Sequence, residues 1–585
     1  MRNGKILNRK FFHFLLPTVL SVMAMSLNEF VDSLLVANLI DSDAMTLVNM
    51  GSPLMIAFAV IYTLLGVGGS TIYAGCLGRY ETEKADKVFT VTMLMAGTVA
   101  LLILIIGFVF IGPLSGLMCK AVEYQPVFEK YIRALILSGV LIIPIQVIIS
   151  FTPAFGCPEK GTFLNITANV VNLIMDYVYI RLLGMGLSGA AYATLSGYAA
   201  GLIIILALCA LKKMRLPFTG ISLSDTRSLT ETVSVGLPPA TNQIGYCIKI
   251  SFTNALAFSL AGMAGTTVFS VCMQAVSMVS VFIGGVINAV IPIASSLYGQ
   301  RDFSGMKILM KTAVRVQFVI NLLILIFFEL WPQGLLAMYN VTGDILPLAE
   351  TGLRIFSVMF LFRGFALIYI FYFPVIGRKT YAFVISIVDG FLGLIPLALI
   401  LTKIHGINGL WEAYALLSVL LLGVVLTFNY ALSVRSGGKY SKLLLLEHED
   451  ENIPVYECTV KMRSENISRL AEDIQGFCTL KGVDTRVAAL TAVSVEEMSV
   501  YSSEQSKTNR IDYLDILLKI YPEYILIDFR SIGSPFDSSA TTKKYSNMEI
   551  LRKTVTNMEY NYILGMNQTR LICSTARAGV SSLQK

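Results

Sequence analysis

The sequence predicts an all-α protein with twelve membrane-spanning helices in two six-helix repeats, followed by a small cytoplasmic α/β sandwich domain. Two observations predict the membrane part. Only 14% of the 585 residues are charged and 55% are hydrophobic, whereas a soluble chain has about 25% charged residues. Long runs such as 88–111 are apolar on every side of a helix, which excludes the amphipathic helices of a soluble bundle.

Each spanning helix needs about 20 mostly apolar residues. Short stretches with Gly, Pro or charge separate the segments that meet this requirement. These segments are 11–38, 50–76, 88–112, 132–152, 161–183, 188–211, 229–259, 264–294, 313–338, 350–374, 381–402 and 408–434. We therefore predict twelve spans.

The positions of Lys and Arg indicate the orientation, because basic loops stay on the cytoplasmic side. An even number of spans places both termini on the same side of the membrane. On that side the Lys and Arg residues concentrate, at 2–10, 79–87, 212–227, 301–315 and 435–442. We expect both termini to be cytoplasmic and the protein to lie in the cytoplasmic (inner) membrane of a bacterial cell. The first apolar run is not a cleaved signal peptide, because it is too long and contains polar residues near residue 29.

An internal repeat divides the membrane part into two halves. Residues of the same type recur 220 or 221 positions apart: Pro17 and Pro238, Gly78 and Gly299, Arg133 and Arg354, and Gly186 and Gly406. We predict an N-terminal six-helix bundle (1–211), a cytoplasmic linker (212–228) and a C-terminal six-helix bundle (229–440). Parallel repeats of this kind hold a substrate site between the halves near the midplane, which is typical of a transporter and not of an enzyme.

The composition becomes polar after about residue 441, and no later run is long enough to span a membrane. Periodicity predicts strands at 455–462 and 524–529, helices at 465–478, 485–501 and near 547–558, and closing strands near 562 and 570–573. We predict a cytoplasmic α/β domain over 441–585.

Ionisable groups inside a membrane span are costly, so they indicate function. The first span carries Asn28, Glu29 and Asp32, and the fifth carries Asn172 and Asp176; each Asn–Asp pair shares one helix face at i,i+4. Carboxylate and amide oxygens can bind Na⁺, and a buried carboxylate can hold a proton. We expect a cation-coupling site here, with Na⁺ held at Asp32 and Asn28 as the one metal. The alternative is that Asp32 and Asp176 lie near the outer headgroups in structural roles.

The second half carries Lys249, Arg363 and Asp389 inside predicted spans. Asp389 can pair with Lys249 or with Arg363, which would offset part of the desolvation cost. The alternative is that a basic group faces a water-filled cleft as a fixed charge. Pro17 and Pro238 remove a backbone hydrogen bond inside a span, and we predict that both act as helix hinges, although a fixed kink is an equal alternative.

Composition excludes several partners and cofactors. The basic residues lie in loops and do not form a patch for nucleic acid. The nine cysteines form no Cys-x-x-Cys pair, so we expect neither a disulfide framework nor a zinc site. We expect no cofactor beyond Na⁺ or H⁺ as coupling ion. The 24 Met residues suit an adaptable apolar cavity for flat hydrophobic cations.

Motifs along residues 10–435 resemble the MATE (multidrug and toxic compound extrusion) family of transporters. The motifs that carry this resemblance are Leu16-Pro17, Asn28 with Asp32, Gly78-Arg79, Asn172 with Asp176, Gly186-Leu-Ser-Gly189, Gly236-Leu-Pro238, Gln274, Pro292, Gly299 and Gly406-Ile-Asn-Gly409. The order of these motifs, together with the repeat, is what makes the resemblance specific.

The resemblance implies twelve helices in two bundles and export of organic cations or other small amphipaths by Na⁺- or H⁺-coupled antiport, with alternating access. It implies that Asp32 leads the coupling site, supported by Asn172 and Asp176, and that Gln274 belongs to the substrate cleft. The chain departs from the family in Glu29, in Ala37 where a glycine is common, and in its charged second half. We expect a monomer in the lipid bilayer.

The C-terminal domain resembles the ATP-binding fold of histidine kinases and anti-sigma-factor kinases. The resemblance is carried by Val495-Glu496-Glu497-Met498, Gly533-Ser-Pro-Phe-Asp537 and Gly565-Met-Asn-Gln-Thr569. Tyr501 and Ser531 stand where active members have the Mg²⁺-binding Asn and the adenine-reading Asp. We therefore expect a degenerate domain with a regulatory or protein-binding role.

Two other functions remain open. A flippase for lipid-linked oligosaccharide or lipid would need a strongly basic central cavity formed by Lys249 and Arg363. A membrane-bound sensor with the C-terminal domain as its output would need intact nucleotide anchors, and their absence at Tyr501 and Ser531 argues against it.

Overall fold

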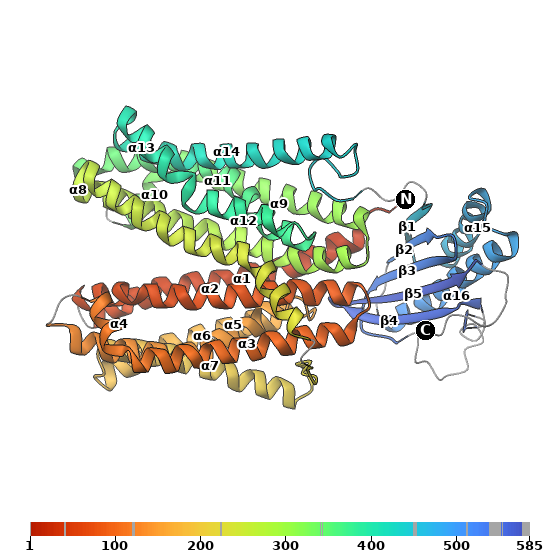
Figure 1. Ribbon diagram of the computed structural model, residues 1–585, viewed down its shortest axis with the longest axis horizontal. Helices are drawn as coiled ribbons and strands as arrows, with labels where there is room; N and C mark the ends of the chain where they lie inside the picture. Colours follow the sequence, from red (N-terminus) through yellow and green to blue (C-terminus); the bar gives the residue numbers. More distant parts are fainter. Residues whose placement is uncertain are drawn as a thin grey trace.

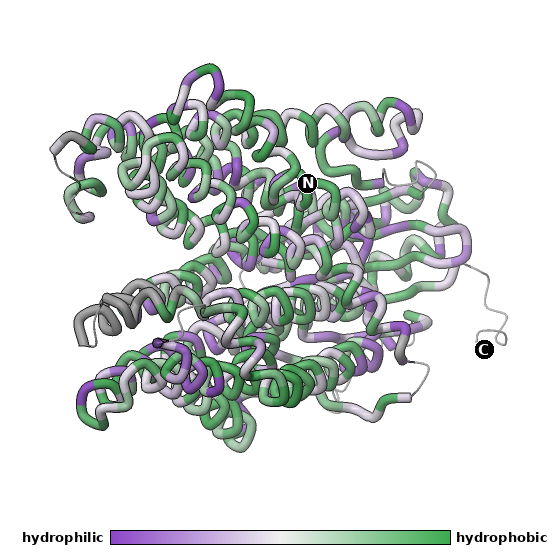
Figure 2. The backbone as a smooth tube through the Cα atoms, turned by 60° about the vertical axis from the view of Figure 1, so that its left-hand side comes forward, coloured by the Kyte–Doolittle hydropathy of each residue, from purple (hydrophilic) through white to green (hydrophobic). Residues whose placement is uncertain are grey.

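The computed structural model describes residues 2–39, 42–119, 123–222, 225–339, 341, 343–447, 453–509, 513–537, 551–552 and 554–575. Two bundles of long helices lie side by side, and a domain of strands and helices covers one end of both (Figure 1). The bundles are predominantly hydrophobic along their length (Figure 2). This distribution fits a bilayer as the solvent of the bundles.

The first bundle runs from the N-terminus to residue 210. It consists of α1 (Lys5–Leu39), α2 (Ser42–Gly78), α3 (Thr82–Val109), α4 (Ile111–Met118), α5 (Gln125–Phe151), α6 (Pro158–Asp176), the π-helix η1 (Tyr177–Leu182) and α7 (Leu187–Ala210). The predicted fifth span, 161–183, corresponds to α6 and η1 together.

The second bundle contains the remaining long helices. It consists of α8 (Thr226–Gly299), α9 (Phe303–Leu330), α10 (Pro332–Met338), the 3₁₀ turn η3 (Gly343–Ile345), α11 (Leu346–Val375), α12 (Lys379–Ile387), the π-helix η4 (Val388–Leu392), α13 (Leu394–His405) and α14 (Ile407–Arg435). The predicted span 381–402 corresponds to α12, η4 and α13.

The helix α8 is much longer than a bilayer is thick. It has 74 residues and would extend about 110 Å if straight, against a hydrocarbon thickness of about 30 Å. The backbone leaves helical geometry at Ala261 and Gly262, where φ of Gly262 is 57°, a conformation that favours glycine. The predicted spans 229–259 and 264–294 are the two arms on either side of this turn.

In the described part of the chain, eleven helices are long and apolar enough to cross a membrane, and α8 is counted once among them. The number of twelve spans stays a prediction, as do the domain boundaries derived from it.

Features of the backbone recur at the offset of the sequence repeat. Helices α3 and α9 each have 28 residues and begin 221 positions apart. Tyr80 and Arg301, also 221 apart, both have positive φ, at 65° and 55°. Gly186 and Gly406 precede α7 and α14 with nearly the same φ/ψ, 58°/−142° and 59°/−139°. The two halves therefore share local backbone geometry as well as sequence landmarks.

The two bundles touch through glycines at the end next to the C-terminal domain. A Cβ atom on Gly78 of α2 would lie 2.1 Å from the carbonyl oxygen of Ser296 on α8. A Cβ atom on Gly299 of α8 would lie 2.2 Å from the carbonyl oxygen of Gly75 on α2. Because no side chain fits at these distances, the two helices meet backbone to backbone. Toward the opposite end the helices of the two bundles spread apart (Figure 2).

The start of α1 belongs to the hydrophobic core of the second bundle. Ile6, Leu7, Phe11 and Phe14 are buried in one cluster with side chains of α8, α9 and α11. The first bundle has its own core, formed mainly by α2, α3 and α5. The first helix therefore connects the two bundles physically.

The C-terminal domain is a five-stranded antiparallel sheet with two helices on one face (Figure 1). The strand order is β1-β2-β3-β5-β4. Its elements are β1 (Val455–Lys461), α15 (Ser464–Leu480), α16 (Thr485–Asn509), β2 (Tyr513–Ile520), β3 (Tyr524–Ile532), β4 (Asn557–Ile563) and β5 (Met566–Ser574).

Two sequence expectations for this domain differ from the structure. The prediction of a helix near 547–558 is wrong at its end, because Asn557 and Met558 pair with β5 in strand β4; most of the preceding segment lies outside the described residues. Strand β2 was not predicted from the sequence. This strand alternates apolar residues with Asp515 and Lys519, and these charges obscure a strand pattern until both faces of the sheet are known to be covered.

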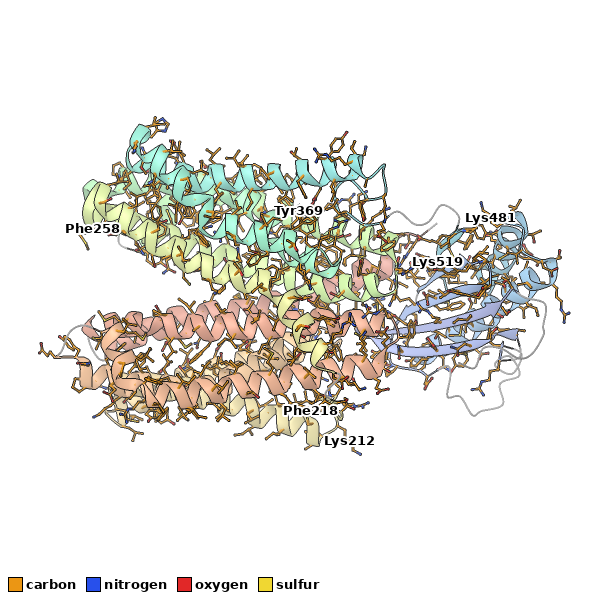
Figure 3. All side chains as sticks on the ribbon, viewed as in Figure 1. Lys212, Phe218, Phe258, Tyr369, Lys481 and Lys519 are labelled. Carbon is orange, nitrogen blue, oxygen red and sulfur yellow. The ribbon has the colours of Figure 1, made fainter. Side chains whose placement is uncertain are left out.

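The sheet has one apolar face and one polar face, as the period of a strand requires. Residues such as Ile516, Ile527 and Leu571 form the domain core with α15 and α16. The other face, which we call the polar face, consists of Asp515, Lys519, Asp528, Arg530, Gln568 and Arg570. It is turned toward the bundles, as the labelled Lys519 illustrates (Figure 3).

The contact between α2 and α8 leads to a stability prediction. Gly78→Ala places a methyl group against the α8 backbone, and we expect it to lower stability by about 1–3 kcal/mol. The control is Gly97→Ala on α3, where a Cβ atom meets nothing within 4 Å. Thermal unfolding in detergent, followed by circular dichroism, should show a lower midpoint for Gly78→Ala only. Equal midpoints for the two variants would contradict the contact.

Candidate functional site

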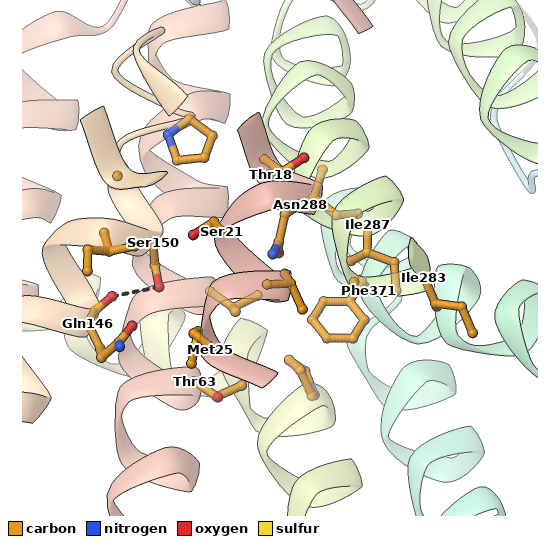
Figure 4. A pocket seen from close by; sticks show the side chains of 18 of the residues that line it. Thr18, Ser21, Met25, Thr63, Gln146, Ser150, Ile283, Ile287, Asn288 and Phe371 are labelled. Carbon is orange, nitrogen blue, oxygen red and sulfur yellow. Dashed lines mark hydrogen bonds between the residues drawn. The ribbon is translucent and has the colours of Figure 1, made fainter. Parts of the chain in front are cut away.

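A cavity of about 490 Å³ lies between the two bundles. It is lined by α1, α2, α5 and α6 from the first bundle and by α8 and α11 from the second. Side chains such as Ser21 and Met25 from α1 surround the same space as Asn288 and Phe371 from the other bundle (Figure 4). The volume lies within the range of small-molecule sites, about 300–1,000 Å³.

The predicted hinge prolines lie in helices next to this cavity. The carbonyl of Pro17 in α1 accepts a hydrogen bond of 2.6 Å from the Thr162 hydroxyl on α6. The backbone of α8 stays helical at Pro238, and its turn lies instead at Ala261 and Gly262. Bending at Pro17 and Pro238 stays a prediction.

An acid–amide cluster lies away from the cavity lining, between α1 and α6. The amide of Asn28 donates a hydrogen bond of 3.0 Å to Asn172 Oδ1. The carboxyl groups of Asp32 and Asp176 interact with each other. The i,i+4 spacing on each helix therefore brings together four of the five predicted coupling residues. The side chain of the fifth, Glu29, lies outside the described residues.

Several polar atoms of this cluster have no hydrogen-bond partner in the described structure. They include Asn28 Oδ1, Asp32 Oδ1 and both carboxylate oxygens of Asp176, and all are buried. A buried acceptor without a donor costs about 1–3 kcal/mol, and two adjacent carboxylates repel each other in a low dielectric. A cation or a proton at this position would relieve both costs. No cluster of three or more His, Cys, Asp or Glu exists in the described chain, so the amides would have to complete such a cation site.

The second bundle contains a buried ion pair. Lys249 Nζ lies 3.4 Å from Asp389 Oδ1, and the two residues are 2% and 5% exposed. The second carboxylate oxygen of Asp389 accepts a 2.9 Å hydrogen bond from the Asn242 amide. Of the two pairings that the sequence leaves open, the structure has Lys249 with Asp389. Because both charges have partners, this pair does not present a free charge to the cavity.

Glycines allow this ion pair to form between α8 and η4. A Cβ atom on Gly245 would lie 2.5 Å from Gly390 Cα, so the two backbones touch there. Lys249 is one helical turn from Gly245, and Asp389 is adjacent to Gly390. The close approach of the helices therefore places the two charged groups within reach of each other.

Of the two remaining residues predicted for the cleft, Arg363 lines the cavity and Gln274 does not. Arg363 on α11 lines the cavity, and its guanidinium lies 5.9 Å from the centre of the Tyr246 ring. Gln274 is not among the cavity-lining residues. Arg363 thus follows the alternative in which a basic group faces the cleft.

Asn242 and Tyr246 line the cavity from α8 and were not predicted from the sequence. A usable signal exists, because Asn242, Tyr246 and Lys249 are spaced i, i+4 and i+7 and so share one helix face. A polar stripe at this spacing inside an apolar span marks the side of a helix that avoids lipid.

Comparison with known proteins agrees with this architecture. The family model MatE matches residues 17–178 and 244–400, more than half of the chain. The chain is 24% identical over 420 residues to the probable multidrug resistance protein YoeA of Bacillus subtilis, covering 68% of this chain and 89% of YoeA. It is 19% identical over 409 residues to the multidrug export protein MepA of Staphylococcus aureus, covering 68% of this chain and 88% of MepA.

Solved structures share the fold of the two bundles. A multidrug resistance MATE family transporter in an outward-facing conformation has a TM-score of 0.69 at 20% identity, covering 75% of this chain and 98% of that chain. A MOP superfamily transporter from Pyrococcus furiosus has a TM-score of 0.68 at 21% identity, covering 74% of this chain and 97% of that chain. The family match ends at residue 400, before the C-terminal domain, so the kinase-like resemblance of that domain stays a prediction.

The buried ion pair leads to a prediction about stability. Lys249→Met leaves Asp389 charged without its partner, and we expect a loss of about 3–5 kcal/mol. The double variant Lys249→Met, Asp389→Asn removes both charges, and we expect it to recover most of that loss. Thermal unfolding in detergent measures both effects.

The control is Arg354→Gln, which removes an exposed pair with Glu350 and should change stability by less than about 0.5 kcal/mol. Losses that simply add in the double variant would show that the two charges do not interact.

Proposed function

Because the chain belongs to the MatE family of multidrug export transporters, we propose that it exports small amphipathic molecules in exchange for Na⁺ or H⁺, by alternating access between the two bundles. Transporters of this family are secondary transporters, so the protein is not an enzyme. It is a multi-pass membrane protein that acts on small drug-like substrates. We propose further that both termini are cytoplasmic.

The acid–amide cluster is the observation that carries the proposed coupling. Asp32 Oδ1 and both carboxylate oxygens of Asp176 are buried without a hydrogen-bond partner in the described structure, so a bound cation or proton would be stabilised there. Asn28 and Asn172 supply amide oxygens of the kind that Na⁺ accepts. Both Na⁺ and H⁺ fit this chemistry, and the choice between them needs an experiment.

Coupling requires that the cation bind the two conformations with different affinity. The cluster is built from α1 and α6, and the substrate cavity uses the same two helices on its first-bundle side. A cation that draws Asp32 toward Asp176 would therefore move helices that also line the cavity. This shared use of α1 and α6 supports antiport over two independent binding events.

The other functions have less support. A flippase for lipid-linked cargo would need both Lys249 and Arg363 in the cavity, but Lys249 pairs with Asp389. The nucleotide anchors expected of a sensor are replaced by Tyr501, which packs against Phe536 at 5.8 Å between ring centres, and by the buried Ser531. For the C-terminal domain we propose a regulatory role, with a partner protein as its expected ligand.

A transport assay tests the coupling. Vesicles containing the full-length protein are loaded with a fluorescent amphipath, and a proton or Na⁺ gradient is imposed separately. We expect one gradient to drive dye movement and Asp32→Asn to abolish it, because the amide cannot hold the cation in the same way. A loss of about 1.4 kcal/mol of cation binding already lowers affinity tenfold.

Glu129→Gln is the matched control. It makes the same chemical change in the first bundle, at an exposed ion pair with Arg133 outside the cluster, and should transport normally. Gradient-driven transport that survives in Asp32→Asn would remove the cluster from the mechanism.

A further inference from the structure

We propose that the cavity selects amphipathic molecules that carry a negative charge, and that Arg363 sets this preference. The inference rests on the proposed export function and names its substrate class. It departs from the expectation of organic cations.

The charge of the cavity lining carries this inference. Arg363 is the only ionised side chain among the described residues that line the cavity, and no Asp or Glu lines it. The remaining lining side chains are mainly hydroxyls, amides and aliphatic groups. Among these described lining residues, an organic cation would therefore meet a like charge and no carboxylate.

In the part of the chain that the structure describes, the buried charges near the lining do not reverse this sign. Lys249 and Asp389 lie behind the cavity wall in the same bundle and neutralise each other at 3.4 Å. Asp32 and Asp176 belong to the separate acid–amide cluster and do not line the cavity. The second-bundle group of Arg363, Lys249 and Asp389 thus has a net charge of +1.

The chemistry around Arg363 suits an anion with an apolar body. A guanidinium offers several N–H donors in a plane and binds carboxylate, sulfonate or phosphate oxygens through two parallel hydrogen bonds. Asn242 and Gln243 line the cavity from α8 and can donate further hydrogen bonds, while Ile283, Ile287 and Phe371 provide an apolar wall. In a cavity of low dielectric, the net charge of +1 on this group of three residues favours an anion and disfavours a cation more strongly than in water.

Two dyes with the same ring system and opposite charge test the proposal. Fluorescein is an anion, and tetramethylrhodamine methyl ester is a cation built on the same xanthene ring. Binding to the purified full-length protein in detergent is measured by fluorescence polarisation, with no ion gradient. We expect the wild type to bind the anionic dye at least about tenfold more tightly than the cationic dye. A tenfold difference in affinity is the effect expected of one charge-assisted hydrogen bond.

Arg363→Gln should abolish this preference, and Arg363→Lys should retain part of it because it keeps the charge. Arg354→Gln, on the same helix α11 but exposed and paired with Glu350, is the control and should bind like the wild type. Equal or tighter binding of the cation by the wild type, binding of neither dye, or an unchanged ratio in Arg363→Gln would each overturn the proposal. Loss of gradient-driven transport with the dye preference intact would count against the coupling only.

A separate set of contacts carries a second inference: we infer that the C-terminal domain is a clasp that holds the two bundles together at one end. Its polar face is charged yet buried, with Asp515, Lys519, Asp528, Arg530 and Gln568 at most 8% exposed. Charged residues are rarely buried unless they are paired. The face is therefore built to contact the bundles and not to face water.

The contacts with the second bundle centre on the turn between α8 and α9. Arg530 donates a hydrogen bond of 3.0 Å to Asp302 and one of 2.5 Å to Gln300. Lys519 donates to the carbonyl of Arg301 at 2.9 Å. Arg2, just before α1, bridges Asp302 at 2.7 Å and Asp515 at 3.3 Å.

Other contacts reach the first bundle. The guanidinium of Arg570 lies over the ring of Tyr80, 4.4 Å from its centre, in the turn between α2 and α3. A Cβ atom on Gly156, between α5 and α6, would lie 2.4 Å from the backbone nitrogen of Gly565 in the β4–β5 turn. One rigid sheet thus touches equivalent turns of both bundles, since Tyr80 and Arg301 occupy the same repeat position.

The Asp302 carboxyl stays ionised at physiological pH, because its pKa is lowered. Burial alone would raise the pKa of the Asp302 carboxyl, but Arg2, Arg530 and the Gly305 N–H hold it well below its usual range. A carboxyl with a lowered pKa stabilises the folded state above its unfolded pKa of about 3.9, and this contribution is lost only as the pH falls below that value. Alternating access would require the bundles to separate at this end. A change of pH within the physiological range would not break the Asp302 contacts, so a conformational change would have to break them.

Hydrogen exchange on the full-length protein tests the clasp without a transport assay. In Arg530→Gln we expect faster amide exchange, by about tenfold or more, in both turns, 79–81 and 300–302. Arg469→Gln, exposed on α15 on the other side of the sheet, is the control. Lys519→Gln removes the bond to the Arg301 carbonyl and replaces Arg530→Gln if that variant misfolds. Faster exchange at 300–302 alone, or at neither turn, would overturn the clasp.

Discussion

The backbone contact between α2 and α8 is the constraint on which the arrangement of the molecule depends. There is no room for a side chain at Gly78 or at Gly299. Gly78 faces the backbone carbonyl of Ser296, Gly299 faces that of Gly75, and both of these residues are also small. Because the bundles meet here, the turns at Tyr80 and Arg301 come close enough for one sheet to cover both. The same contact fixes one end of the two bundles, so that the cavity can form only where their helices are further apart.

The bilayer explains why the charges are distributed as they are. In hydrocarbon every polar group must find a partner within the protein, and the second bundle meets this requirement by pairing Lys249 with Asp389. The first bundle does not, because Asp32 Oδ1 and both carboxylate oxygens of Asp176 are buried without a hydrogen-bond partner in the described structure. We propose that this unpaired acidic cluster binds a mobile cation. Under the proposed function, cation and substrate would bind at separate places, because the acidic cluster lies in one bundle and Arg363 lines the cavity from the other.

Local patterns predicted most of the fold, and long-range contacts account for what they missed. Apolar length located every long helix, and the repeat of Pro, Gly and Arg landmarks anticipated the shared backbone geometry at Gly186 and Gly406. The i,i+4 spacing anticipated the acid–amide cluster. The partner of Asp389 could not be chosen, because it depends on the approach of Gly245 to Gly390, which are far apart in sequence. Strand β2 was missed for a similar reason, since Asp515 and Lys519 look exposed until the bundles that cover them are known.

The helix α1 joins all of these features along one backbone. Arg2 precedes it in the ion network under the C-terminal domain, and its first turns, at Phe11 and Phe14, lie in the core of the second bundle. After Pro17 the same helix lines the cavity with Ser21 and Met25 and then contributes Asp32 to the cluster of the first bundle. Met25 and Asp32 are seven residues apart, about 10 Å along a helix. A change in occupancy of the cluster therefore needs no relay of side chains to reach the cavity. We propose that a bend in α1 is sufficient, because its start lies in the core of the second bundle and Asn28, near its end, bonds to Asn172 of the first.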